Sequence, residues 1–546
     1  MADERVARAL PWGAAAAYAV PALWAARDYG LVFDAHFWFP FGDDVLHYVL
    51  GHGRWPLQPY NADLEAYGPL AATGAAVTNA VLHDWLGLVN PLLGHHVFIV
   101  LCGAALVGLT AWLARRFGGF RLGALAAALL AVSPRFFAEA VNNIVDAPAT
   151  VVWTAAIACV VLALDTARVA PLFGAAVALG ALGAIKLPNV PFVPLILLVW
   201  ILVDAESRRG AGRLLVATRW WVLLALVLTA PLALWVFRPI AWTAPRVDFW
   251  TVYDRLFVPP PWMTRGIVSI FYRGQLLRGG PPSYHAAMFA VTTPVPQLLA
   301  AAVGAVVVWR RQRTAAWLLV VWLTVSVGRF AFLRLGNYDG VRHALDAFPA
   351  LAVLEAFGVA GALDVLARRA PRYVAASTVA VLVVVLAPGA TAIWRLHPYP
   401  MTYYNALVGG LAGAAHSFET EYSGAAYREA VAWAMDHLGA GDVLWITRAS
   451  YDRRLVQVEA SYLGLDPNRV QDGTALGFAE RHARDGGRIF AVQNFRAPPE
   501  EKLPPGLAGA AVPLVYEVGR DGVPFLRIRE VLPSDLQAVL ATSMGR

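Results

Sequence analysis

The sequence predicts a polytopic α-helical membrane protein with an α/β domain at its C-terminal end. Of its 546 residues, 58% are hydrophobic and only 15% are charged, and the mean hydropathy of +0.55 is well above that of soluble domains. Apolar runs long enough to enter a bilayer recur as far as Trp394. Beyond Trp394 the chain becomes polar enough for a water-exposed domain of about 150 residues.

About eleven apolar runs are candidate membrane spans. The first follows Arg5 and Arg8, and its length favours an uncleaved helix over a cleaved signal peptide. The candidate spans are Leu10–Ala26, Leu92–Ala114, Leu122–Phe137, Ala147–Leu164, Pro171–Ile185, Val190–Val203, Trp220–Phe237, Ala286–Trp309, Ala315–Phe332, Ala344–Leu366 and Tyr373–Trp394. We therefore expect a membrane domain over residues 1–394 and a second domain over 395–546.

The arginines between these runs predict the topology. If the N-terminus lies in the cytoplasm, every inner loop is basic, as the positive-inside rule requires. The outer side then receives two long segments, 28–91 and 238–285, and everything after residue 395. The inner-loop arginines are Arg115, Arg116, Arg121, Arg168, Arg208, Arg209, Arg213, Arg310, Arg311, Arg313, Arg368, Arg369 and Arg372.

Charge and cysteine content exclude other classes of protein. The net charge is +7, but the arginines fall in short clusters between apolar runs, so a topology signal explains them better than nucleic-acid binding. The two cysteines, Cys102 and Cys159, lie inside apolar runs and offer neither a disulfide framework nor a cysteine metal site. No inner loop is long enough to fold as a nucleotide-binding domain.

The region after residue 395 has α/β patterning. Residues 425–438 have helical spacing of apolar residues, and 442–447 and 488–492 have the composition of strands. Residues 512–531 predict a hairpin that turns near Arg520–Gly522. We expect ordinary surface and core residues here, although Glu419–Tyr422 and nearby tyrosines could also line a groove for an acceptor.

Carboxylates beside the predicted spans are the first candidates for chemistry. Asp43 and Asp44 lie beyond the first span on its outer side, and Asp146 immediately precedes the fourth. Asp146 also fits a helix cap followed by an early proline. A carboxylate that acts as a general base needs only reach to the proton it removes. Asp43, Asp44, His47 and His52 could instead bind a divalent cation, although their spacing matches no closed metal motif.

Basic residues on the same side supply a complement. Lys186 ends an apolar run, Arg265 and Arg273 lie in an aromatic outer segment, and Arg342 and His343 precede the tenth span. Charges at such depth are costly unless they are paired or hydrated, and they are functional candidates for that reason. Snorkelling toward the headgroups is the alternative for each arginine. Carboxylates and cations on one face together suggest a base beside a phosphate-binding site.

Several segments, in this order, resemble bacterial family 39 glycosyltransferases of the GT-C superfamily, which includes protein O-mannosyltransferases and lipid A aminoarabinose transferases. The sequence has Asp44 where that family more often has Glu, so the second carboxylate has a shorter reach. The resemblance covers most of the chain. The segments are Asp43-Asp44-x-x-His47, Pro134–Phe137 with Asp146, Asn337–His343, and His397–Tyr399 with Tyr403–Gly410.

The resemblance implies a GT-C transmembrane enzyme of the bacterial cytoplasmic membrane, with its N-terminus in the cytoplasm and its C-terminal domain outside. It implies transfer of a sugar, with inversion, from a polyprenyl-phosphate monosaccharide to a hydroxyl of a glycan, protein or lipid. Asp43 would be the base, Asp44 and Asp146 would assist, and the basic residues would hold the donor phosphate. These are Lys186, Arg265, Arg273, Arg342 and His343. The resemblance implies no particular cofactor, and whether a divalent cation is needed is left open.

Two other functions compete with this hypothesis. A transporter or flippase for a lipid-linked or anionic solute would also place charges among its helices. The candidate charges gather at one face instead of the midplane, and no inverted repeat is evident, which favours the transferase. A GT-C protein that has no catalytic activity and serves as a binding module is the second alternative, and loss of turnover on substitution of Asp43 separates it from an enzyme.

Overall fold

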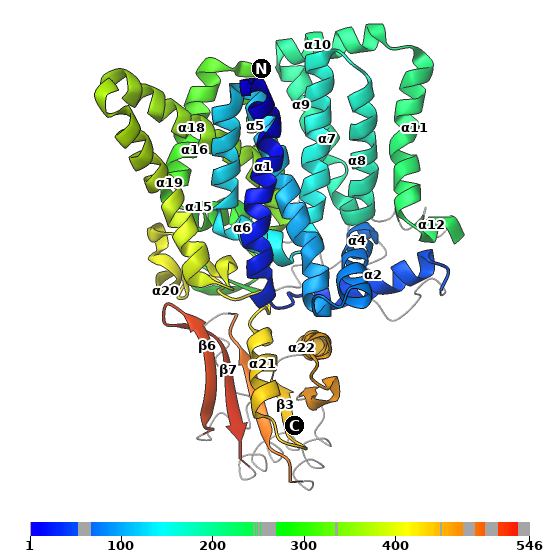
Figure 1. The fold of residues 1–546 in the computed structure, drawn as a ribbon, viewed down its shortest axis with the longest axis vertical. Helices are drawn as coiled ribbons and strands as arrows, with labels where there is room; N and C mark the ends of the chain where they lie inside the picture. The colour runs from blue at the N-terminus through cyan, green and yellow to red at the C-terminus, as the bar shows by residue number, and fades with distance from the viewer. Residues whose placement is uncertain are drawn as a thin grey trace.

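The computed structural model describes residues 2–52, 67–243, 246, 248, 250, 252, 269–332, 337–447, 450–472, 486–496 and 512–532. A bundle of long helices forms one part, and a mixed sheet flanked by two helices lies at one end of the bundle (Figure 1). The α-helices are α1 (Ala2–Ala25), α2 (Ala35–Val49), α4 (Leu70–Asn79), α5 (Pro91–Ala131), α6 (Pro134–Asn142), α7 (Asp146–Thr166), α8 (Ala170–Lys186), α9 (Phe192–Val203), α10 (Ala205–Ala217), α11 (Trp220–Phe237), α12 (Ile240–Thr243), α15 (Tyr284–Thr292), α16 (Val295–Arg311), α17 (Arg313–Phe332), α18 (Phe348–Arg369), α19 (Val374–Leu396), α20 (Gly410–Ala414), α21 (Tyr427–His437) and α22 (Ser450–Leu463).

The long helices confirm a polytopic membrane protein. Within the described residues, 7 helices are long and apolar enough to cross a membrane, or up to 8 if the bent pair α15 and α16 forms one span. The bend of 115° in that pair breaks the predicted span Ala286–Trp309. Only 6% of the most apolar stretch of α11 is buried, and only 17% of that in the segment Pro371–Leu396, which contains α19. Both helices therefore expose apolar surface suited to lipid. The count of about eleven spans stays a prediction.

Two predicted spans, Leu92–Ala114 and Leu122–Phe137, share the single element α5. The backbone of Gly118 and Gly119 is not helical, and Gly119 has a φ of 75° that glycine adopts without a steric penalty. A Cβ at Gly123 would lie 2.7 Å from the carbonyl oxygen of Ala111. Two residues twelve positions apart approach this closely only if the chain folds back, so α5 contains two packed segments. The second segment ends at Ala131, because Pro134 begins the separate helix α6.

The C-terminal sheet has five strands in the order β4-β3-β5-β7-β6. Strand β3 (Val443–Ile446) pairs in parallel with β4 (Val470–Asp472) and β5 (Ile489–Asn494). Strand β7 (Val523–Val531) is antiparallel to both β5 and β6 (Leu514–Arg520). The predicted α/β elements are therefore confirmed, including the hairpin at Arg520–Gly522. A second, two-stranded sheet joins β1 (Ser269–Tyr272) to β2 (Gln275–Arg278).

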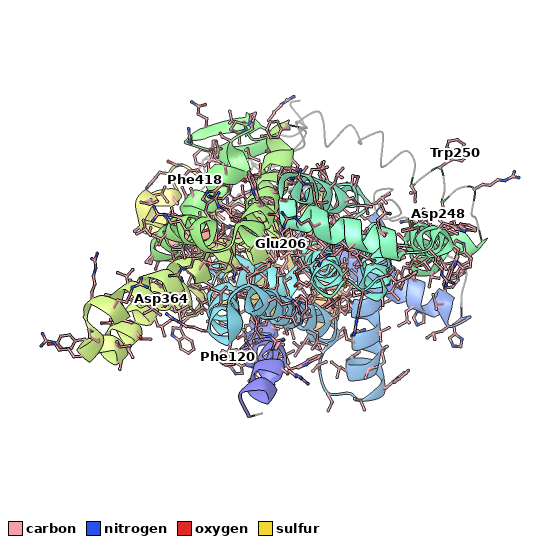
Figure 2. All side chains as sticks on the ribbon, turned by 90° about the horizontal axis from the view of Figure 1, so that it is seen from above. Phe120, Glu206, Asp248, Trp250, Asp364 and Phe418 are labelled. Atoms are coloured by element: carbon pink, nitrogen blue, oxygen red, sulfur yellow. The ribbon has the colours of Figure 1, made fainter. Side chains whose placement is uncertain are left out.

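The two ends of the helical bundle differ. The N-terminus and α10, which carries Arg208, Arg209 and Arg213, lie at the end farther from the sheet (Figure 1). Seen from above, Glu206 of α10 lies near the centre of the bundle, whereas Asp248 and Trp250 lie at its edge (Figure 2). Helices α2, α4 and α12 lie toward the other end, and α2 packs against α22 of the C-terminal region (Figure 1). The basic helix and the sheet are thus separated by the length of the bundle.

Candidate functional site

A buried ion pair joins the start of α7 to the end of α8. The ammonium of Lys186 donates to Oδ1 of Asp146, and about 7% of each side chain is exposed. Asp146 is not the N-cap of its helix, since Val145 occupies that position and Asp146 is the first helical residue. Its position in the first turn still places the carboxylate at the positive end of the α7 dipole. The structure therefore favours an ion-pairing role for Asp146 over the helix cap.

A second acidic side chain shares a hydrogen-bond donor with Asp146. The amide of Asn143 donates to Oε2 of Glu139 at 2.6 Å and to Oδ2 of Asp146 at 3.0 Å. The side-chain oxygen of Asn143 accepts in turn from the backbone N–H of Asp146 at 2.8 Å. Helix α6 thereby fixes where the carboxylate of Asp146 lies. Glu139 also accepts from the hydroxyl of Tyr422 at 3.4 Å, which connects this helix to the chain beyond α19.

Arg342 extends the cluster toward the first outer segment. Its guanidinium pairs with Oδ2 of Asp339 at 2.8 Å and with Oδ2 of Asp34 at 3.3 Å. The charges of Arg342 and Asp146 also interact. Five charged side chains from distant parts of the chain, counting Lys186, thus lie in one region. Because most of them are removed from water, their mutual interactions are stronger than those of surface charges.

Asp34 has an unusual backbone conformation. It is the N-cap of α2 with φ 79° and ψ −36°, and its side chain does not cap the helix. Aspartate at an N-cap ordinarily accepts from the first turn, which is worth about 1 kcal/mol. A positive φ outside glycine costs roughly a further 1–3 kcal/mol and is found most often at functional sites. Asp34 forgoes the cap and instead directs its carboxylate to Arg342.

The turn that carries Arg342 and His343 is anchored from α17. In this 3-10 turn, η4 (Arg342–Ala347), Asp346 pairs with the buried Arg329 at 2.7 Å. Arg329 also donates to the carbonyl oxygen of His343 at 2.8 Å. The ring of His343 packs edge-on against Tyr338 with 4.7 Å between centroids. These contacts fix the turn, so Arg342 and His343 are held at the cluster by a separate structural ion pair.

Asp43 and Asp44 lie on α2, some distance along the helix from Asp34. Oδ1 of Asp43 lies 3.1 Å from Nε2 of His95, whose ring stacks between Phe39 and Tyr462. Asp43 is 31% exposed, and Asp44 and His47 are exposed. Among the residues that the structure describes, no group of three or more His, Cys, Asp or Glu side chains could hold a metal ion. Asp43, Asp44 and His47 therefore do not form such a group.

Two predicted phosphate ligands are not part of the cluster as described. Arg273 lies in the tight turn between β1 and β2 with a φ of 52°, is exposed, and places its guanidinium 5.4 Å from the ring centroid of Tyr272. No contact within the described residues joins it to Arg342 or Lys186. Arg265 lies outside the described residues, as does Lys502. The structure thus brings together Asp146, Lys186, Arg342 and His343 from the predicted set.

Glu139 makes the cluster sensitive to pH near neutrality. Burial raises the pKa of this carboxyl from 4.5 to about 7, against the opposing effects of Asn143 and Arg342. Between these values the folded protein holds a proton that the unfolded chain has released. This contribution to stability is therefore fully present below pH 4.5 and is lost as the pH rises through 7, by about 3 kcal/mol in total.

Glu139→Gln should remove this pH dependence, because the amide is neutral at every pH. We expect the variant and the wild type to unfold at similar temperatures at about pH 5, and the variant to unfold at a higher temperature at about pH 8. Thermal unfolding in detergent across this range measures the difference. If the unfolding temperatures of the two proteins change in parallel over the whole pH range, Glu139 does not titrate in this range.

Comparisons with known proteins agree with the helical architecture. Residues 86–235 match the family described as dolichyl-phosphate-mannose-protein mannosyltransferase. The crystal structure of ArnT from Cupriavidus metallidurans in the apo state matches with 16% identity and a TM-score of 0.52. The match covers 95% of this chain and 98% of that one. The chain therefore has a GT-C type of fold. The form bound to undecaprenyl phosphate matches with 16% identity and a TM-score of 0.51, over 94% of this chain and 97% of that one.

A third structure extends the likeness within GT-C proteins. The apo oligosaccharyltransferase of Archaeoglobus fulgidus matches with 13% identity and a TM-score of 0.50, over 89% of this chain and 69% of that one. A comparison with curated protein sequences gives no significant match. The predicted GT-C architecture with its C-terminal α/β region is confirmed. At these identities the comparisons establish the fold, and the chemistry has to be argued from this chain's own residues.

Residues that the sequence did not single out complete the candidate site. Asp34 and Asp339 both contact Arg342, Glu139 shares Asn143 with Asp146, and Arg496 pairs with Asp339. Glu139 stands two residues after Pro134–Phe137, one of the segments that carry the family resemblance. An acidic residue among apolar neighbours is unusual and could have marked Glu139 as a candidate from the sequence. Asp34 stands in a segment rich in aromatic residues, where a single carboxylate carried no further mark.

Proposed function

We propose that the chain is a membrane glycosyltransferase that moves a sugar from a polyprenyl-phosphate monosaccharide to an acceptor hydroxyl, with inversion at the anomeric carbon. One observation carries the proposal: at the sheet-facing end of the bundle, the half-exposed carboxylate of Asp34 pairs with the partly buried Arg342, whose charge also interacts with Asp146, the partner of the buried Lys186. A base next to cations is the arrangement that transfer from a phosphate donor requires. The undecaprenyl phosphate bound by ArnT supports a lipid-linked donor.

The carboxylate acts on the acceptor. It takes the proton of the acceptor hydroxyl, whose oxygen attacks the anomeric carbon from the face opposite the phosphate. The bond from the anomeric carbon to the phosphate oxygen breaks, and its electron pair leaves with the polyprenyl phosphate. Asp34 is the base that the geometry favours, and Asp43 is the base that the sequence resemblance implies. Asp146 orients the acceptor or the base through its contact with Lys186.

The cations act on the donor. Lys186 and Arg342 hold the phosphate and stabilise the negative charge that grows on it as the sugar departs, with His343 beside Arg342. Electrostatic stabilisation of this kind usually lowers the barrier of such reactions more than any other effect. Lys186 is held by Asp146, and the turn that carries Arg342 is anchored by the Arg329–Asp346 pair, so both cations are fixed in place before the donor arrives. Arg265 and Arg273 stay predictions from the sequence.

The proposed topology follows from the two ends of the bundle. We place the N-terminus and the basic helix α10 in the cytoplasm and the C-terminal sheet outside, in a bacterial cytoplasmic membrane. A lipid-linked donor loaded inside then reaches a site that faces outward. The domain boundary near residue 395 and an acceptor that is a glycan, a protein or a lipid belong to the same proposal.

The purified protein tests this function directly. We expect transfer of radiolabelled sugar from at least one polyprenyl-phosphate monosaccharide in a panel, with an inverted anomeric configuration in the product. A parallel reaction with chelator measures whether a divalent cation is needed. If no donor is turned over or hydrolysed, and the protein instead moves a lipid-linked solute across vesicles, the transferase proposal is overturned in favour of a transporter.

A further inference from the structure

The C-terminal sheet contributes one charged side chain to the ion cluster. Arg496 follows the end of β5 and is 8% exposed. Its Nη2 donates to Oδ1 of Asp339 and its Nε donates to Oε1 of Glu419, both at 2.5 Å. Oδ2 of the same Asp339 pairs with Arg342. Asp339 is therefore a bridge between an arginine of the sheet and an arginine of the proposed donor site.

The bridge is held rigidly on both sides. Asp339 has a φ of 55°, and the next residue, Gly340, donates its backbone N–H to the hydroxyl of Tyr284 at 2.9 Å. On the other side, the backbone N–H of Thr420 donates to the carbonyl oxygen of Arg496 at 3.0 Å. The side chain of Asn494 donates to Oε2 of Glu421 at 3.0 Å. The end of β5 thus has a fixed place against the segment that follows the last membrane helix.

Arg342 and Arg496 share the carboxylate of Asp339, and this sharing determines how strongly Arg342 can bind the phosphate of a donor. While Arg496 engages one oxygen of Asp339, the carboxylate is partly neutralised before it meets Arg342. Without Arg496, the full negative charge of Asp339 would act on Arg342 at short range in a buried setting, where charge interactions are strong. The phosphate of a donor would then have to displace a fully charged Asp339 from Arg342.

We propose that Arg496 is a positioning residue through which the C-terminal sheet keeps Arg342 available to the donor phosphate. This inference rests on the proposed function, and it gives the C-terminal region a part in donor binding. It assigns Arg496 no contact with the donor. The ligand that responds to Arg496 is the phosphate of the lipid-linked sugar, and the route of the effect is the carboxylate of Asp339.

The test measures donor KM and kcat for the wild type and its variants, in detergent, with the donor that the wild type uses. We expect Arg496→Gln to raise the donor KM about tenfold, because the fully charged Asp339 then competes with the donor phosphate for Arg342, with a smaller change in kcat. Adding Asp339→Asn to that variant should bring the donor KM back to within about threefold of the wild type, because the unneutralised carboxylate is gone. Arg488→Gln is the control, since Arg488 precedes the same strand and pairs with Asp442 away from the cluster.

A purely structural role for Arg496 gives another pattern. In that case Arg496→Gln would lower the amount of folded protein and the unfolding temperature but leave the donor KM unchanged. Adding Asp339→Asn would then not change the donor KM either. If Arg496→Gln does not fold, Asp339→Asn alone decides, because asparagine tolerates the positive φ and releases Arg342. Its donor KM should fall about threefold, and an unchanged or higher KM overturns the inference. Absence of turnover by the wild type is a failure of the proposed function and is seen before any variant is compared.

Discussion

Asp34→Asn should abolish sugar transfer, with kcat reduced about 10³-fold or more, because a general base contributes roughly 10²–10⁴-fold and asparagine cannot accept the proton. The substitution preserves size, and its amide oxygen still accepts from Arg342, so the fold and the donor KM should change little. Initial rates of transfer at saturating donor measure the effect. A loss of this size corresponds to about 4 kcal/mol of transition-state stabilisation.

Three further aspartates of the same outer segment make the experiment decisive. Asp43→Asn tests the base implied by the resemblance, and Asp44→Asn tests its neighbour. Asp28→Asn is the matched control, since this exposed carboxylate pairs with His397 at 2.9 Å, outside the cluster. Residual activity above a tenth of wild type in Asp34→Asn, together with complete loss in Asp43→Asn, would assign the base to Asp43 and refute the geometric argument.

The fold was predictable because its signals are local. Membrane helices need only apolar runs, and the hairpin of β6 and β7 needs alternating strands with Asp521-Gly522 at the turn, both in positive φ. Helix α22 was not predicted, since Ser450–Leu463 is polar on much of its surface and its apolar face is defined by packing on α21, β4, α2 and α5. The fold-back within α5 likewise depends on two glycines that also fit a loop.

The site was predictable only where charge is rare. Asp146, Lys186 and Arg342 stand out because each adjoins an apolar span, where an ionised group needs a reason. Asp34 lies in an aromatic segment outside the predicted spans, and Asp339 and Arg496 lie in more polar stretches, where single charged residues are ordinary. Their significance comes from partners 308 and 157 residues away, Arg342 for Asp34 and Asp339 for Arg496. One sequence without coordinates contains no signal for such pairs.

Lys186→Met should destabilise the protein by about 3–5 kcal/mol and abolish transfer. The substitution keeps the volume of the side chain but leaves the carboxylate of Asp146 buried without its cation, which is the costly way to break a buried pair. Asp146→Asn should cost a similar amount, since it leaves the ammonium of Lys186 buried instead. The unfolding temperature in detergent and the transfer rate are measured together for each variant.

The double variant Lys186→Met, Asp146→Asn separates stability from function. With both charges removed, the buried pair becomes a neutral contact, and the side-chain oxygen of the new amide still accepts from Asn143, as Asp146 does now. Replacement of a whole buried pair is often nearly neutral, so most of the lost stability should return. Transfer should stay absent, because the cation that stabilises the leaving phosphate is missing. A double variant that regains activity with stability would show that Lys186 and Asp146 serve the fold alone.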